Sequence, residues 1–152
     1  MNLAADPAKG IPATLPWRLL AVAYDLLPVL ALWMAVSAVV LLLRGNQPLA
    51  PFSAGQWMLW FGCWLVAGGY AVLSWRRGGQ TLGMRPWRLT VCAADGGRAS
   101  LGALWLRYAV AGVSLAVFGL GFLWSLFERE QRTWHDLASG TVMLRLPKTS
   151  RP

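Results

Sequence analysis

Residues 19–43 read LLAVAYDLLPVLALWMAVSAVVLLL and decide the fold of this chain. A helix over these 25 residues would rise about 37 Å, which exceeds the roughly 30 Å of hydrocarbon in a bilayer. Arg18 precedes the run, and Pro16 suits the first position of a helix because its missing N–H needs no partner there. We therefore predict a transmembrane helix over residues 16–43.

One charged side chain, Asp25, lies within this apolar run. An aspartate at the centre of a membrane helix costs about 2.5–3.5 kcal/mol on insertion scales, so it needs a partner, a water-filled cavity or a proton. Arg18 projects from the same face but lies about 10 Å away along the helix axis. We therefore expect the partner of Asp25 to come from a distant segment. Pro28 removes a backbone hydrogen bond three residues later and is expected to kink the helix.

The composition indicates one integral membrane domain. Hydrophobic residues make up 57% of the chain and charged residues only 13%, against about 25% charge in soluble domains. The net charge of +8 comes from cations just outside apolar runs, which suits anionic lipid headgroups better than nucleic acid. We divide the chain into a flexible N-terminal segment (1–15), a transmembrane domain (16–146) and a basic C-terminal tail (147–152).

A second apolar run predicts a helix from Ala54 to Trp75, with Ser53 as its N-cap. At 100° per residue its glycines and tryptophans fall on opposite sides. The glycine stripe comprises Gly55, Gly62 and Gly69, and the tryptophan stripe comprises Trp57, Trp60 and Trp64. Because small residues let helices approach closely in lipid, we expect the glycine stripe to face another helix. The tryptophans then face lipid or a partner.

The third apolar run, residues 101–127, raises a question of topology. The connection 44–52 has one cation, whereas the loop 76–101 and the tail after residue 127 have five each. Positive charge favours the cytoplasmic side, and one straight span would separate the loop from the tail. We therefore favour a re-entrant helical hairpin that turns near Gly119, with a third straight span as the alternative. The predicted class is an all-α integral membrane protein.

The polar segments contain recognisable turns. Asp95-Gly-Gly97 predicts a turn beside a short hairpin or extended loop at 88–94. Thr133 to Asp136 reads as a capping box that opens a short helical turn ending at Gly140. The final residues, 141–147, alternate poorly in polarity and are expected to form an extended surface segment.

Several short motifs occur together in a characteristic order. They are Arg18-Leu-Leu-Ala-Val-Ala-Tyr-Asp25, Gly79-Gln-Thr81-Leu-Gly83, Leu104-Trp-Leu-Arg107 and Thr133-Trp-His135-Asp136. In these motifs the chain resembles the RDD family of membrane proteins, named for one arginine and two aspartates. The resemblance covers nearly the whole chain and assigns these roles to Arg18, Asp25 and Asp136, with Gly79, Thr81 and Gly83 as a loop motif. It implies a small prokaryotic multi-pass protein, for which transport of an unidentified ligand is often suggested. Met84 and Pro86 depart from the usual loop pattern.

The charges predict contacts between distant segments. We expect Arg107 to pair with Asp25, and Asp136 to pair with Arg18. Both pairings require the middle loop and the tail on one side of the membrane, as the hairpin does. Two interpretations stay open: the charges hold the helices in register, or they form a ligand or proton pathway.

Enzymatic activity is not expected. His135 beside Asp136 resembles a catalytic pair, but no serine or cysteine nucleophile accompanies a base and an orienting group. The single histidine leaves no metal-ligand spacing, so we expect neither a metal nor another cofactor. Cys63 lies in an apolar run and Cys92 in a basic loop, which predicts no structural disulfide.

These features predict a multi-pass protein of the bacterial cytoplasmic (inner) membrane with its N-terminus in the cytoplasm. Two function classes fit. The first is transport of an ion or small solute, with Asp25 at its centre. The second is a non-transporting scaffold or accessory subunit. The expected partners are anionic lipid headgroups and either further copies of the chain or a membrane partner protein.

Overall fold

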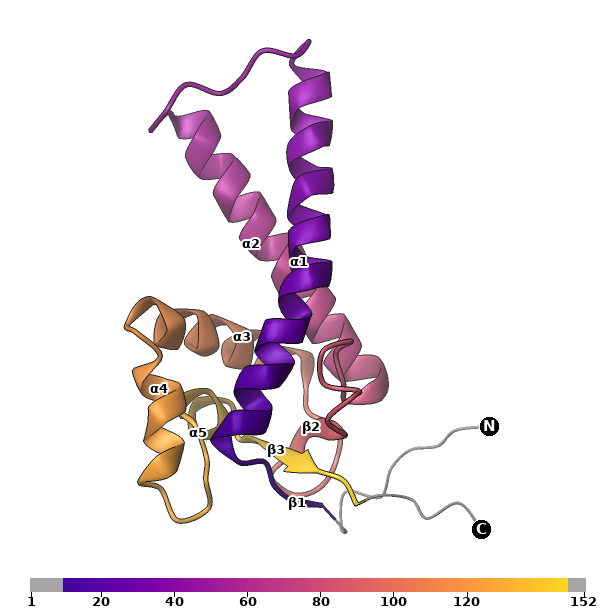
Figure 1. Cartoon of the computed structure of the whole chain (residues 1–152), viewed down its shortest axis with the longest axis vertical. Helices are drawn as coiled ribbons and strands as arrows, with labels where there is room; N and C mark the ends of the chain where they lie inside the picture. The colour runs from indigo at the N-terminus through magenta and orange to yellow at the C-terminus, as the bar shows by residue number, and fades with distance from the viewer. Residues whose placement is uncertain (1–9, 148–152) are drawn as a thin grey trace.

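Two long helices dominate the structure, a computed structural model that describes residues 10–147. They are α1 (Leu15–Leu43) and α2 (Ala54–Gly78), and both are long and apolar enough to cross a membrane. Figure 1 shows them crossing near the rest of the chain and spreading apart toward the loop that joins them. α1 continues through Pro28. The backbone N–H of Gln56 donates to the Ser53 hydroxyl, which caps α2 as predicted.

The third apolar run is bent. Helix α3 (Leu101–Ala116) is followed by the short α4 (Leu120–Leu123) and the 3-10 turn η2 (Trp124–Leu126), at an angle of 107°. Gly119 has a φ of +76° in the connection, and the neighbouring Phe118 is 95% exposed. The straight span is therefore excluded, and the favoured turn near Gly119 is present. The chain is a mostly helical membrane protein with two spanning helices and a bent third segment.

A small antiparallel sheet joins three distant parts of the sequence. Its strands are β1 (Ile11–Pro12), β2 (Leu89–Ala93) and β3 (Thr141–Arg145), in the order β1-β3-β2. The central strand β3 pairs with both neighbours. Strands of one sheet must lie on one side of a membrane, so the N-terminal segment, the middle loop and the segment after α4 share a side. Figure 1 places them at the end of the molecule opposite the α1–α2 loop.

The sheet corrects three expectations. Of the two expectations for residues 88–94, the hairpin is not present and the extended conformation is, but Leu89–Ala93 form a strand that pairs with residues 141–145. That second segment is not a surface strand, because Thr141 and Met143 are buried. Ile11 and Pro12 pair with β3, so the described part of the 1–15 segment is ordered. Residues 1–9 and 148–152, including most of the expected basic tail, lie outside the described residues.

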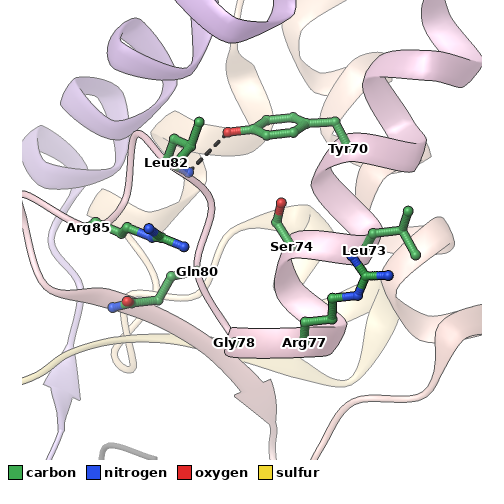
Figure 2. Close-up of a pocket in the computed structure, with 8 residues that line it drawn as sticks. All are labelled: Tyr70, Leu73, Ser74, Arg77, Gly78, Gln80, Leu82 and Arg85. Carbon is green, nitrogen blue, oxygen red and sulfur yellow. Dashed lines mark hydrogen bonds between the residues drawn. The ribbon is translucent and has the colours of Figure 1, made fainter. Parts of the chain in front are cut away.

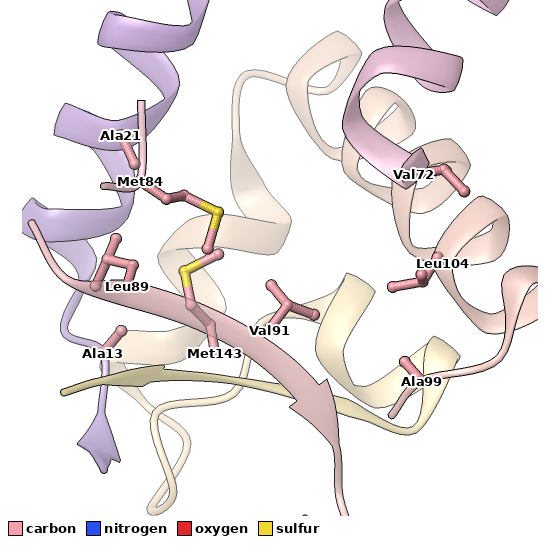
Figure 3. Packing of buried hydrophobic residues seen from close by; sticks show 9 residues of the cluster. All are labelled: Ala13, Ala21, Val72, Met84, Leu89, Val91, Ala99, Leu104 and Met143. Carbon is pink, nitrogen blue, oxygen red and sulfur yellow. The ribbon is translucent and has the colours of Figure 1, made fainter. Parts of the chain in front are cut away.

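The hydrophobic core lies between the sheet and the helices that cover it. It comprises Ala13, Ala21, Val72, Met84, Leu89, Val91, Ala99, Leu104 and Met143. In Figure 3, Met84 and Met143 point toward one another between α1 and the sheet. Removing this apolar surface from water stabilises the fold at about 25 cal/mol per Å². The core thereby fixes the positions of the charged residues beside it.

The glycine stripe of α2 does not face a helix of this chain. A methyl group added at Gly62 or Gly69 would meet no atom within 4 Å. The helix contact uses Gly68 instead, where an added methyl would collide with the rings of Trp105 and Tyr108 of α3. The helix expected against this stripe is therefore not one of the described helices of this chain. The close approach itself follows the expected principle, because a small residue admits the neighbouring helix.

Candidate functional site

The first charge site, the buried triad, joins Arg18, Asp136 and Arg107. Nη1 of Arg18 lies 2.6 Å from Oδ2 of Asp136, and Nη1 of Arg107 pairs with the other carboxylate oxygen. All three residues are at most 2% exposed. They come from α1, α3 and the short helix α5 (Trp134–Ser139). The triad therefore ties three elements together beside the sheet.

Local sequence explains how α5 presents its carboxylate. Asp136 Oδ2 accepts hydrogen bonds from the backbone N–H of Thr133 at 3.1 Å and from its hydroxyl at 2.9 Å. The N–H of Asp136 donates back to the Thr133 hydroxyl, which completes the predicted capping box. α5 ends at Gly140, whose φ of +60° suits a glycine. The cap thus holds the carboxylate between the two arginines.

Each arginine of the triad has further partners. Arg18 donates from Nε to the carbonyl of Ala13 at 2.8 Å and from Nη2 to the carbonyl of Gln131 at 3.1 Å. Arg107 donates to the hydroxyl of Thr141 at 2.7 Å, and its guanidinium carbon lies 5.5 Å from the centre of the Trp75 ring. Several hydrogen bonds to each buried cation offset the cost of removing it from water.

The triad sets the protonation of its neighbours. Burial alone would raise the pKa of Asp136, but Arg107 and Arg18 hold that pKa well below its usual range. Burial lowers the pKa of His135 to about 3, and the nearby Arg107 acts in the same direction. At neutral pH, Asp136 is therefore an anion and His135 is uncharged. One carboxylate between two guanidinium groups has a net positive charge and does not suit a metal cation.

These contacts decide the predicted pairings. The pairing of Arg18 with Asp136 is confirmed. The pairing of Arg107 with Asp25 is wrong, because Arg107 contacts the same aspartate as Arg18 does. His135 packs on the ring of Phe122, with centroids 4.8 Å apart, and its Nδ1 has no hydrogen-bond partner among the described residues.

The second charge site surrounds Asp25, which is held by neutral donors. The Tyr70 hydroxyl donates to Oδ1 at 2.7 Å, and the backbone N–H of Gly83 donates to the same oxygen at 2.9 Å. The hydroxyl of Thr81 donates to Oδ2. Within residues 10–147, no arginine, lysine or histidine forms an ion pair with Asp25. The expectation of a cationic partner was therefore wrong.

The loop motif brings two of these donors to α1. Gly79, with a φ of +71°, ends α2, and its carbonyl accepts from the N–H of Val91 at 2.7 Å. Thr81 is buried and directs its hydroxyl at Asp25. Gly83 lies so close to α1 that an added methyl carbon would come within 2.7 Å of the Asp25 carboxyl carbon. The three motif residues therefore hold the loop on α1.

Tyr70 is the partner of Asp25 that the sequence analysis missed. Its hydroxyl donates to Asp25 and accepts from the backbone N–H of Leu82 at 3.0 Å. A signal existed, because a tyrosine within a membrane helix carries a polar group that needs a partner. The sequence alone did not show that Tyr70 and Asp25 face each other across α1 and α2.

An open cavity of about 530 Å³ adjoins Tyr70. It lies beside the last two turns of α2 and the loop that follows them. Figure 2 shows Arg85 directed into it from the loop and Ser74 directed into it from α2. Tyr70 lines the cavity and also contacts Asp25. Tyr70 therefore lies between the cavity and the Asp25 carboxylate.

The sequence was compared with known families, curated proteins and solved structures. The sequence model of the RDD family matches residues 12–140, which is most of the chain. The chain belongs to the RDD family. No curated protein and no solved structure matches it.

The three residues to which the sequence resemblance assigns the name-giving roles lie in two sites of this structure. Arg18 and Asp136 meet in the buried triad, whereas Asp25 belongs to the second site with Tyr70, Thr81 and Gly83. α1 connects the sites, because both Arg18 and Asp25 belong to it. In the buried triad, both carboxylate oxygens of Asp136 are paired with arginines, while Nη2 of Arg107 has no hydrogen-bond partner among the described residues. Asp25 is the RDD carboxylate whose charge no described cation neutralises.

Proposed function

We propose that this RDD protein moves an ion or small solute across the bacterial cytoplasmic membrane, with Asp25 as the charged group that the transported species meets. One observation carries the proposal: Asp25 is held by three neutral donors, and no described cation pairs with it. A carboxylate without an ion-pair partner can interact with a small cation.

The charge distribution supports an orientation with the sheet in the cytoplasm. Five arginines lie at the sheet end, in the last turn of α2 and the segment before α3: Arg76, Arg77, Arg85, Arg88 and Arg98. The opposite loop has the single cation Arg44. Cytoplasmic loops carry the excess of arginine and lysine in membrane proteins. The N-terminus and the segment after β3 then lie in the cytoplasm.

A pathway past Asp25 requires more than one copy of this chain. The apolar part of α1 has no buried residue in its most hydrophobic stretch, and α1 and α2 spread apart beyond their crossing (Figure 1). Gly62 and Gly69 leave open space on α2, where a second helix can approach closely. We infer a homo-oligomer in which a neighbouring copy fills this gap.

Flux in proteoliposomes that contain only this chain tests the proposal. Proton, sodium and potassium gradients are imposed in turn, and internal ion-sensitive dyes record their dissipation. Wild-type protein is expected to dissipate one of them. Asp25→Asn keeps the size of the side chain but removes its charge, so its flux is expected to fall to that of protein-free vesicles. Asp95→Asn is the matched control, because Asp95 lies in an exposed turn.

The second candidate, a scaffold or accessory subunit, is supported by the exposed apolar faces of α1 and α2. It predicts no flux from wild-type protein for any of the three ions, together with copurification of one fixed membrane partner. That combined result would overturn the transport proposal. Equal flux from Asp25→Asn and wild type would also overturn the role of Asp25.

A further inference from the structure

The cavity beside α2 contains two arginines that the two charge sites do not use. Arg77 comes from the last turn of α2 and Arg85 from the following loop. Both are exposed, and neither forms an ion pair or a side-chain hydrogen bond within residues 10–147. Figure 2 shows the Arg85 guanidinium directed into the cavity, with the Arg77 side chain on its opposite side. Two unpaired cations across one concave surface favour an anion.

The helix dipole accounts for the positions of Arg76 and Arg77 but not for that of Arg85. Basic residues in the last turn of a helix interact favourably with its dipole. Arg76 does so while donating to the carbonyl of Ala99 at 3.2 Å, which anchors it away from the cavity. Arg85 belongs to a different segment, so the helix dipole gives no reason for its position opposite Arg77.

The remaining lining matches a phosphate-bearing group with an apolar attachment. The Ser74 hydroxyl points into the cavity (Figure 2) and adds a neutral donor between the two cations. Leu73 and Leu82 line the same cavity and are 49% and 51% exposed. The site adjoins the cationic end of a membrane-spanning helix, where phospholipid headgroups lie. Arginine binds phosphate oxygens through paired N–H groups.

We propose that this cavity binds a phosphate group, held between Arg77 and Arg85, of an anionic phospholipid or of a free phosphate solute. The phosphate oxygens accept from the two guanidinium groups and from Ser74. Acyl chains of a lipid would leave along Leu73 and Leu82. This site is separate from Asp25 and does not depend on the proposed flux.

Native mass spectrometry of the full chain in detergent tests the site. Protein is mixed with phosphatidylglycerol or with diacylglycerol of the same chains, which lacks the phosphate. We expect retention of phosphatidylglycerol and not of diacylglycerol. The double variant Arg77→Gln/Arg85→Gln should bind phosphatidylglycerol about 30-fold more weakly, which corresponds to about 1 kcal/mol for each cation at a membrane surface. Inorganic phosphate is added as a competitor to separate the two sources.

The matched control is Arg98→Gln/Arg129→Gln, which removes the same charge from exposed positions outside the cavity. It should retain phosphatidylglycerol as wild type does. If inorganic phosphate displaces the lipid, the site exists and its ligand is a free phosphate. If the lipid resists displacement, the site exists and its ligand is the phospholipid. Equal losses in both double variants, or equal retention of diacylglycerol, would overturn the proposal. Circular dichroism confirms that each variant is folded.

Discussion

At the scale of single residues, the buried triad acts as a structural clamp. Asp136 is shared by Arg18 and Arg107, so neither cation is left without a counter-charge. Removing one member of a buried ion pair typically costs about 3–5 kcal/mol, because the remaining charge loses its compensation. All three residues are inaccessible to solvent. The triad therefore explains how α1, α3 and α5 stay together, and it takes no part in the transport that we propose for Asp25.

His135 predicts a pH dependence of stability. Its pKa is lowered to about 3 by burial and by Arg107 and Arg18, although Asp136 acts in the opposite direction. Between this value and the unfolded value of about 6.5, the unfolded chain binds the extra proton. The free energy of unfolding should therefore fall as pH falls from about 6.5, by at most about 1.4 kcal/mol per pH unit. Thermal unfolding in detergent at a series of pH values measures this slope.

His135→Gln is the test variant, because glutamine is polar and does not titrate. Its unfolding temperature should change little between pH 6.5 and about 4, the range in which His135 alone contributes. The folded pKa of Asp136 lies below its usual value, so the stability from Asp136 is lost only as pH falls below about 4. The same slope in His135→Gln and wild type would show that another group is responsible.

The sequence predicts contacts between residues better when both lie beside fixed landmarks. Arg18 and Asp136 each begin a short motif next to a helix start, and their pairing is present. The position of Arg107 in the sequence of α3 indicates how far along the helix it lies, but not toward which neighbouring element its side chain points. That direction depends on the bend after Ala116 and on the packing of Gly68 against Tyr108. The partner of Arg107 therefore could not be predicted from the sequence pattern.

At the scale of elements, the loop that follows α2 packs on α1, and this contact depends on one glycine, Gly83. Gly83→Ala places a methyl carbon about 2.7 Å from the backbone nitrogen and the carboxyl carbon of Asp25. Overpacking of this kind typically costs about 1–3 kcal/mol. We expect a lower unfolding temperature in detergent and a weaker contact between the loop and Asp25.

Gly102→Ala is the matched control for this substitution. Gly102 lies in α3, and an added methyl carbon there meets nothing within 4 Å. Alanine is favoured over glycine in a helix by roughly 0.5–1 kcal/mol, so this variant should unfold at a slightly higher temperature. An unchanged unfolding temperature in Gly83→Ala would show that the loop moves freely away from α1.

Elements with strong local signals were predictable, and the sheet was not. α1 and α2 follow from long apolar runs, and the capped ends at Ser53 and Gly140 follow from local side chains. The strand β1 has only two residues and no pattern of its own. β3 lacks clear alternation of polarity because its buried positions are the polar Thr141 and the apolar Met143, while the apolar Val142 and Leu144 between and after them are only half-buried. Its existence depends on pairing between segments more than 40 residues apart.

At the scale of the whole molecule, sidedness follows from the sheet and the bend together. β2 and β3 pair, so the segments before and after the bent α3–α4 unit lie on one side. The loop between α1 and α2 lies at the other end (Figure 1). From the charge excess we propose that the sheet faces the cytoplasm. The fold determines that the sheet and the α1–α2 loop lie on opposite sides of the membrane. The distribution of charge determines which of the two sides is the cytoplasm.

Labelling in intact cells measures both properties. Gln47→Cys lies in the exposed α1–α2 loop and Arg98→Cys in the exposed middle loop, and the two natural cysteines are buried. A membrane-impermeant thiol reagent should modify Gln47→Cys in intact cells and Arg98→Cys only after permeabilisation. A reporter fused after Pro152 should be cytoplasmic. The reverse pattern at all three points would overturn the orientation alone. Arg98→Cys and the reporter on opposite sides would overturn the sheet pairing, and with it the proximity of Asp136 to Arg18.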